Sequence, residues 1–516
     1  MKKFLTLFLI ILLCQITKAQ SEFITVWKPA LNAIPTVSVD APAQATSNQI
    51  WFPGIGENYT IQWEEVGFPQ HNGTMADVTS VKQVLIDFGP SSNPDPSLAT
   101  YRVKVKNGNG IFKQIRFGEA QLISGAEFII PFWVMFGSSD KITAIEQWGN
   151  ISWVSMNSAF ANCKLLTLTA DDAPNLSNVI DASFMFMNTT SFTGAVSMQN
   201  WDTSHIQDFS FMFARLNEMS QLPDQFNPPY FDSWNMIAAQ NLRYMFMSRI
   251  YFNQSLNSWN VSNVKNMSWM FGATSFNQRL DKWDTSNVER MDYMFHGINT
   301  FNQSLQTWDT SKVINMAHMF HYCTAFNQPL NSWDVSKVTN MSLMLNGATS
   351  FNQSLANWKL NPLVNAGNFL YNTALSCENY SKTLVGWADD PNTPNNINIS
   401  LLSPLTYAAN IIPKRNILIN KGWILTGDAA GSCFLATSEN TLKKSGGIYP
   451  NPVQDNIHVE DFSDVFDFKI LDTAGRLLKS GKTDSDEINV SALPKGIYIL
   501  QIISKDKMQS FKFIKK

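Results

Sequence analysis

The stretch FNQSLNSWNVSNVKNMSWMF (Phe252–Phe271) returns three times along the chain with few changes. It reads FNQRLDKWDTSNVERMDYMF from Phe276, FNQSLQTWDTSKVINMAHMF from Phe301 and FNQPLNSWDVSKVTNMSLML from Phe326. A further FNQ begins at Phe351, so the phrase recurs every 24 or 25 residues. Self-similarity at such a period predicts a repeat architecture, in which each copy buries its apolar side chains against its neighbours.

Each copy divides into an extended half and a half with helical spacing. Phe, Leu and Trp alternate with polar residues in the first half, whereas Val288, Met291, Met294 and Phe295 follow the offsets of one helical face. We therefore predict an α/β repeat solenoid, leucine-rich-repeat-like, with short parallel strands plus short helices, about 24–25 residues per coil, flanked by small all-β domains. Continuation of the Met-Phe pair extends the array to about nine coils over residues 145–375. The structural repeat positions are Phe252, Phe276, Phe301, Phe326 and Phe351, with Asn277, Asn302 and Asn327.

The FNQ-x-L segment, the W-D-[TV]-S turn and the N-M-x-x-M-F segment resemble the BspA-family leucine-rich-repeat surface proteins of bacteria. The resemblance covers nearly half of the chain. It implies a secreted or cell-surface protein of adhesive or interaction type. Members of that family differ in their partners, so the resemblance implies no particular ligand.

The flanks of the repeats have compositions of their own. Residues 1–19 begin with a positive segment that contains Lys2 and Lys3, followed by an apolar run of about ten residues and small residues near Ala19, which is typical of a signal peptide. Residues 20–120 contain alternating stretches such as FITVW and YRVKV, which predict a β-sandwich-like N-terminal domain. Residues 376–436 lose the repeat and are expected to cap it, and residues 437–447 are expected to be a linker.

The last block, residues 448–516, carries YPNP from Tyr449, D-x-x-G from Asp472 and L-x-x-G-x-Y from Leu493. It resembles the type A C-terminal sorting domain of the type IX secretion system. That resemblance implies transport by the type IX machinery across the outer membrane of a Gram-negative bacterium, followed by surface attachment or release.

Composition and motifs exclude several classes of function. The net charge is −3 and only 15% of residues are charged, so nothing indicates a nucleic-acid partner. After the signal peptide no apolar run is long enough for a transmembrane span. The sequence has no G-x-S-x-G and no H-E-x-x-H, and we expect no enzyme activity and no cofactor.

Two columns of equivalent residues are candidate binding positions. Trp259, Trp283, Trp308, Trp333 and Trp358 are either core residues or an exposed surface that stacks on sugars. Asp284, Asp309 and Asp334 either cap their own helices, where the helix dipole favours an anion, or form a calcium ladder. We expect capping, with no metal site.

Three further groups of residues carry structural predictions. The Asn-Gln pairs are expected to satisfy backbone groups at the turns. His296 and His321 are equivalent and His318 lies near them, and we expect solvent-facing helix ends with a transition-metal site as the alternative. Cys377 and Cys433 can form a disulfide, whereas Cys163 and Cys323 lie too many coils apart to pair.

Together these patterns predict a non-enzymatic secreted or outer-membrane surface protein of a Gram-negative bacterium. Its expected partners are a protein or glycan ligand and, through residues 448–516, the type IX machinery. Adhesion to host, matrix or neighbouring-cell ligands is the leading function, and the alternative is a carbohydrate-binding surface module of a glycan-handling system.

Overall fold

The computed structural model describes residues 21–31, 45–121, 132–216, 224–435, 447–459, 466–473, 475–483, 485–504 and 507–516. The predicted signal peptide lies outside these residues, and so does the predicted linker except for Gly447. The chain divides into two compact units, Met1–Leu435 and Ala436–Lys516, and each is described by itself.

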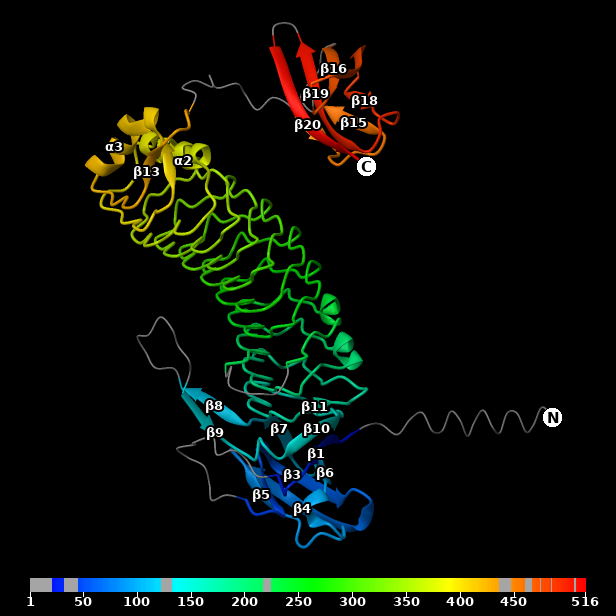
Figure 1. Cartoon of the computed structure of the whole chain (residues 1–516). Helices are drawn as coiled ribbons and strands as arrows, with labels where there is room; N and C mark the ends of the chain where they lie inside the picture. Colours follow the sequence, from blue (N-terminus) through cyan, green and yellow to red (C-terminus); the bar gives the residue numbers. More distant parts are fainter. Residues whose placement is uncertain are drawn as a thin grey trace, which may run out of the picture. The chain divides into compact units, whose positions relative to one another are not determined.

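A seven-stranded sheet opens the first unit (Figure 1), with the order β11-β10-β1-β6-β3-β4 and β7 paired to β3. Every second residue of its central strands is buried, because successive side chains of a strand point to opposite faces. The strands are β1 (Phe23–Trp27), β3 (Gly54–Glu65), β4 (Phe68–Ser80), β6 (Tyr101–Lys106), β7 (Ile111–Ile115), β10 (Ile142–Gln147) and β11 (Thr167–Leu168). Two separate ribbons pair β2 (Gln49–Phe52) with β5 (Val84–Asp87) and β8 (Gly118–Gln121) with β9 (Phe132–Met135), and a 3-10 helix, η1, spans Pro96–Leu98.

A buried carboxylate ties a loop to this sheet. Glu65, 1% exposed, accepts hydrogen bonds from Ser91 Oγ at 2.6 Å and from the N–H groups of Ser92 at 2.8 Å and Asn93 at 3.0 Å. Glu65 Oε2, which accepts the Ser92 N–H, also lies 2.5 Å from His71 Nδ1. Burial raises the pKa of Glu65, but these hydrogen bonds outweigh burial and leave the pKa below its ordinary value.

The sheet runs past residue 120, where the predicted N-terminal domain ends, and continues directly into the repeats. β10 pairs antiparallel with β1 and parallel with β11, through Ala144↔Thr167 and Ile145↔Leu168. One hydrophobic core therefore extends from Phe23 in the sheet to Leu425 beyond the last repeat.

The repeats differ from the predicted architecture. Among the described residues from Thr169 to Ser376 there is no strand and no α-helix, only the 3-10 helices η2 (Val196–Asn200) and η3 (Phe231–Ser233). Consecutive copies are joined by isolated parallel bridges, such as Asn315↔Asn340 and Asn340↔Asn365. The predicted α/β repeat solenoid with a strand and a helix in every coil is therefore wrong: regular structure consists of small β-sheets and few helices.

The backbone hydrogen bonds explain why the helical spacing predicted a helix where the structure has turns. Tyr293 N–H donates to Ala317 O at 2.9 Å, in the next copy, whereas the next N–H, that of Met294, donates to Met291 O at 3.2 Å in its own copy. Successive N–H groups thus alternate between a carbonyl of the next copy and a carbonyl of their own copy, so each copy is a series of turns rather than a helix. Such turns also return apolar side chains to one side every third or fourth residue, which is the spacing that predicted a helix.

The repeat phenylalanines form the centre of the stack. Phe252, Phe276, Phe301, Phe326 and Phe351 are all 0% exposed. The Phe271 ring lies 4.0 Å from the ring of Phe276, which begins the next copy, and 5.8 Å from the ring of Phe295 at the end of that copy. Stacked aromatic pairs contribute about 0.5–1.5 kcal/mol beyond the burial of their area, so this column stabilises each copy only through its neighbours.

Two helices follow the last repeat and complete the first unit (Figure 1). They are α2 (Cys377–Asp389) and α3 (Ile412–Asn420), accompanied by the 3-10 helix η4 (Ala409–Ile411) and the parallel pair β12 (Thr406–Ala408) and β13 (Ala429–Gly431). Ser376 caps α2 by accepting the Asn379 N–H at 3.2 Å. A disulfide joins Cys377 to Cys433, whereas Cys163 and Cys323 are buried thiols.

The second unit consists of two antiparallel sheets around a core that includes Ile470 and Leu500. The three-stranded sheet has the order β14-β15-β18 and the four-stranded sheet the order β17-β16-β19-β20. Their bounds are β14 (Ile448–Tyr449), β15 (Asn456–Val459), β16 (Phe466–Asp472), β17 (Leu477–Thr483), β18 (Glu487–Asn489), β19 (Gly496–Ser504) and β20 (Lys507–Lys515).

Candidate functional site

A column of polar residues sets the backbone of the Met-Phe half of each copy. These residues form the isolated bridges between copies, and we call them the bridge column: Asp181, Asp208, Asn241, Asn266, Arg290, Asn315, Asn340 and Asn365. Every Asp and Asn of the column accepts, with its Oδ1, the N–H two residues later at 2.8–3.2 Å. Asp and Asn favour such turns because their short side chains reach the backbone two residues on.

Three residues after each bridge residue except Asn365 lies a side chain of a second column, here called the aromatic column. Its members all have a left-handed backbone, with φ between 54° and 61°: Phe184, Phe211, Tyr244, Trp269, Tyr293, His318 and Leu343. Such a conformation costs about 1–3 kcal/mol for a bulky residue and persists only where its surroundings enforce it. Here the cross-copy hydrogen bonds enforce it, together with stacking of neighbouring rings at centroid distances of 4.1–5.7 Å.

A pocket of about 530 Å³ lies where the first repeats meet the β7–β8 segment of the sheet region. Phe184 and Phe211 of the aromatic column belong to its lining. The remaining lining is polar: Gln114, Arg116, Glu119, Ser155, Asn157, Asp181, Ser183, Asp208, Ser210, Asn241 and Arg243. A volume of this size is typical of sites that hold a small molecule or a side chain of a partner.

Charges of both signs converge on this pocket. Arg116 pairs with Glu119 at 3.1 Å, and the Arg243 guanidinium lies 4.7 Å from the centre of the Tyr244 ring. Asp208 Oδ2 accepts a hydrogen bond from Asn241 Nδ2 at 3.2 Å. The pocket therefore offers both donors and acceptors on side chains whose positions are fixed by neighbouring copies.

The tryptophan column does not form a binding surface. Trp259, Trp283, Trp308, Trp333 and Trp358 are only 1–3% exposed. Each donates its indole N–H to a backbone carbonyl about one copy earlier, as Trp283 does to Leu256 O at 2.8 Å and Trp358 to Leu330 O at 2.8 Å. The candidate sugar-stacking surface is contradicted by this burial, because no ring face is left for a ligand.

The aspartate column closes turns in place of the helices it was expected to cap. Asp284, Asp309 and Asp334 each accept the N–H of the serine two residues later, at 2.9–3.0 Å. The hydroxyl and N–H of Ser311 lower the pKa of Asp309. Among the described residues, the group of three or more potential metal ligands that lie close together is formed by other side chains.

The Asn-Gln pairs form a continuous ladder along the repeats. Asn302 N–H donates to Asn277 Oδ1 at 3.1 Å, and Asn327 N–H donates to Asn302 Oδ1 at 2.9 Å. Gln328 Nε2 also donates to Asn302 Oδ1 at 3.0 Å. Each asparagine oxygen thus holds two donors of the next copy, which fixes the register between copies.

The three histidines form a half-buried cluster, so the prediction of solvent-facing helix ends is wrong. His321 is 9% exposed, and His296 and His318 are half-buried. Suitable ligand atoms of the three side chains all lie within 4.8 Å of one another.

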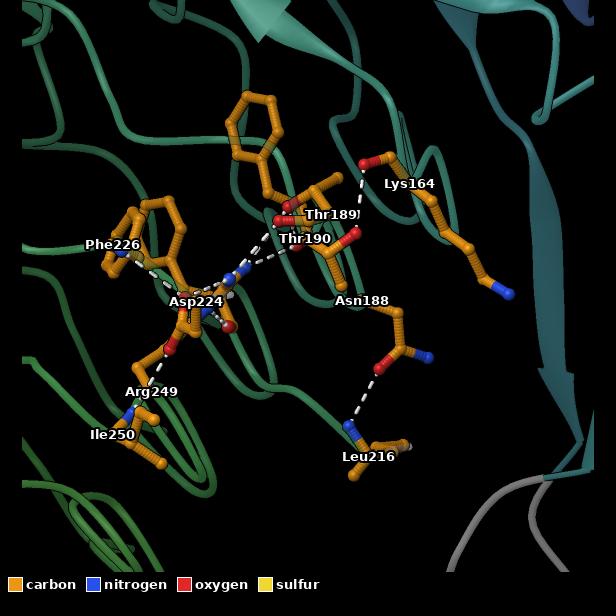
Figure 2. Close-up of polar contacts among 11 residues, drawn as sticks. Lys164, Asn188, Thr189, Thr190, Leu216, Asp224, Phe226, Arg249 and Ile250 are labelled. Carbon is orange, nitrogen blue, oxygen red and sulfur yellow. Dashed lines mark hydrogen bonds and ion pairs between the residues drawn. The ribbon is translucent and has the colours of Figure 1, made fainter. Parts of the chain in front are cut away.

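An ion pair anchors the segment that interrupts the regular spacing near residue 224 (Figure 2). Arg249 and Asp224 are 0% and 1% exposed, and Arg249 Nη1 lies 3.1 Å from Asp224 Oδ1. Arg249 also donates to Thr189 O and Thr189 Oγ1, both at 3.1 Å, while Asp224 Oδ2 accepts the Ile250 N–H at 3.1 Å. These contacts join the segment around Asp224 and the copy that contains Arg249 to the earlier copy that contains Thr189.

Sequence reasoning missed the aromatic column, the pocket and the ion pair. The sequence did contain a signal for the aromatic column, since the residue directly before each Met-Phe pair is Phe, Tyr, Trp or His in most copies. The pocket had no signal of its own, because its lining comes from five separate parts of the chain. Arg249 stands alone in an otherwise uncharged phrase, which could have marked it as buried and paired.

Comparison with known families bears on two parts of the chain. The family model described as "Mycoplasma protein of unknown function, DUF285" matches three overlapping stretches, residues 133–229, 154–282 and 271–383. These stretches span the repeats, and the chain therefore carries DUF285 repeats, whereas the BspA-family resemblance stays a prediction.

The family model described as "Secretion system C-terminal sorting domain" matches residues 447–516. The chain is therefore exported by type IX secretion, to the cell surface or beyond it, as the YPNP, D-x-x-G and L-x-x-G-x-Y motifs predicted. Within the part of the chain that the structure describes, no helix is long and apolar enough to cross a membrane. Neither the curated proteins nor the solved structures contain a significant match to the chain.

Proposed function

We propose that this exported chain is a non-enzymatic interaction protein that mediates adhesion at the surface of a Gram-negative bacterium. In this proposal, the repeats present a ligand-binding pocket and the C-terminal sorting domain delivers the protein to its place of action. The observation that carries the proposal is the pocket of about 530 Å³, whose polar lining includes Asp181, Asp208 and Asn241 of the bridge column. A rigid polar site loses little conformational entropy when it binds.

The mixed charge of the pocket favours a protein ligand. Arg116 and Arg243 can pair with carboxylates of a partner, and Glu119 and Asp208 can accept hydrogen bonds from its basic or amide groups. Complementary charges of this kind set specificity and the association rate. Segments of a host, matrix or neighbouring-cell protein are therefore the ligands that this proposal expects first.

A glycan is the second candidate ligand, and a different part of the lining favours it. Gln114, Asn157 and Asn241 bring side-chain amides to the pocket, and Ser155 brings a hydroxyl. Amide groups supply both donors and acceptors, which suits the hydroxyl groups of a sugar. The buried tryptophan column gives this candidate no support.

The proposal is tested by screening the purified full-length chain against matrix proteins and a glycan array. The informative variants are Glu119→Gln and Arg243→Gln, which remove one charge each while keeping a polar side chain. We expect either variant to weaken binding of a protein ligand about 10-fold or more, because each group would be desolvated on binding.

Arg279→Gln is the matched control, because Arg279 is 74% exposed and does not line the pocket. It should leave affinity within about 2-fold. Binding that survives both pocket variants unchanged would contradict the location of the site. Equal adhesion of cells that have and lack the protein would contradict the function.

A further inference from the structure

The cluster of His296, His318 and His321 has the composition of a metal site. We propose that these three side chains bind one divalent transition-metal ion of the zinc class, with a fourth coordination position left to water or a ligand. The three residues come from two adjacent copies, so metal binding would also link those copies. This proposal is independent of the pocket and of the function proposed for it.

The distances suit coordination by three imidazoles. His318 Nδ1 and His321 Nδ1 lie 3.1 Å apart, and the ligand atoms of all three residues lie within 4.8 Å of one another. Zinc–nitrogen bonds of about 2.0–2.1 Å in a tetrahedral site place neighbouring nitrogens about 3.4 Å apart. One pair is thus already near the required separation, and the third ring needs a shift of about 1 Å.

An unsatisfied polar atom points to the same conclusion. His296 Nδ1 is buried and has no hydrogen-bond partner in the structure. A buried polar atom without a partner costs about 1–3 kcal/mol, so such an atom in a native protein calls for a specific explanation. A metal ion bound at this nitrogen would remove that cost.

The surroundings keep the rings neutral and oriented. Burial, followed by the neighbouring histidines, lowers the pKa of His296 to about 4 and that of His318 to about 3. Burial also lowers the pKa of His321, against a hydrogen bond with Asn346. Neutral imidazole is the form that binds metals.

Aromatic neighbours shield the cluster and hold its rings. Tyr293 stacks on His318 at 4.1 Å and Tyr322 stacks on His321 at 4.0 Å. His318 is also fixed by its left-handed backbone, with φ of 57°. Fixed rings lose little freedom when they bind an ion, which favours affinity.

The repeats themselves supply substitutions that should fold. Tyr293 occupies the position of His318 in the preceding copy, and Asn346 occupies the position of His321 in the following copy. We therefore choose His318→Tyr, His321→Asn and the double variant. His205→Asn is the matched control, because His205 is exposed and lies outside the cluster.

The test is titration of the full-length chain, without an oligohistidine tag, with Zn²⁺ by calorimetry and with Co²⁺ by visible absorption. We expect one ion per chain with a dissociation constant in the micromolar range or below, and the absorption bands of tetrahedral Co²⁺. His318→Tyr/His321→Asn should weaken binding at least about 100-fold, whereas His205→Asn should change it less than about 2-fold. Zn²⁺ should also raise the unfolding temperature of the wild type but not that of the double variant.

Two results would overturn the proposal. One is the lack of any Zn²⁺ binding tighter than about 100 µM in a chain that folds normally. The other is binding of unchanged affinity in the double variant, which would place the ion at other residues. A fold check by circular dichroism separates a lost site from a lost structure.

Discussion

Replacing Arg249 with Met removes one partner of the buried ion pair while keeping an unbranched side chain of similar length. Asp224 would then keep its negative charge at 1% exposure without its ion-pair partner. Breaking a buried ion pair from one side costs about 3–5 kcal/mol, because the remaining charge is not solvated. The carbonyls of Phe213 and Thr189 would also lose their donor. We expect the free energy of unfolding to fall by about 3–5 kcal/mol.

The assay is equilibrium unfolding in urea, followed by tryptophan fluorescence. Trp201 and Trp234, whose rings stack at 5.9 Å, lie in the interrupted copies and report on them. Arg249→Met/Asp224→Asn removes both charges and should recover about 2 kcal/mol or more of the loss, since the unpaired charge is its main cause. Recovery will be incomplete, because Asp224 also accepts the Ile250 and Phe226 N–H groups.

Arg279→Met provides the matched control. Arg279 also pairs with an aspartate, Asp281, but its side chain is 74% exposed. An exposed pair contributes about 0–1 kcal/mol, so the control should change stability by no more than that. A loss in Arg249→Met as small as in the control would refute the reasoning, because it would mean that the buried charges are not what joins these copies.

Three further predictions concern the ladder, the sheet and the disulfide. Asn302→Ala should cost about 1–2 kcal/mol and Asn302→Asp less, since aspartate keeps the acceptor that holds two donors of the next copy; equal costs in urea unfolding would contradict the ladder. Because folding lowers the pKa of Glu65, this carboxylate stabilises the protein above the pKa of the unfolded chain, about 4.5, and the stabilisation is lost as pH falls below that value. Wild type should therefore lose more stability than Glu65→Gln between pH 5 and pH 3. Parallel curves of stability against pH would argue against this. Cys377→Ser/Cys433→Ser should cost about 2–4 kcal/mol for a loop of 56 residues, and a reductant should lower the melting temperature of wild type but not that of the variant.

The period of the repeat could be predicted from the sequence, and the conformation of one copy could not. Identical residues at a fixed spacing force identical environments, so burial of Phe276 and stacking of its equivalents follow from repetition alone. The offsets of Val288, Met291, Met294 and Phe295, in contrast, fit both a helix and a series of turns. Hydrogen bonds decide between the two, and here every second donor goes to the next copy. That choice depends on the neighbour and is not visible within one copy.

The exposure of the tryptophan column likewise could not be predicted from the sequence. Sequence spacing placed Trp259 and its equivalents in one column but left open which way the column faces. The indole N–H settles the question physically, since a carbonyl of the preceding copy accepts it inside the core. Which residues reach the surface thus depends on how the copies stack. The candidate binding residues are therefore the polar residues at the junction with the sheet, in place of the tryptophans.

The same dependence explains why function can vary while the stack is kept. The bridge column, the Asn-Gln ladder and the phenylalanines use nearly all the residues that recur, and their contacts are between copies. Both candidate sites also use residues that differ between copies, beside members of the bridge column such as Asp208 that line the pocket. His318 replaces the Tyr of one neighbouring copy and the Leu of the other, and Arg243 precedes an aromatic residue where other copies have Ser, Asp or Ala. Departures from the repeat, more than the repeat itself, therefore mark where this protein can bind.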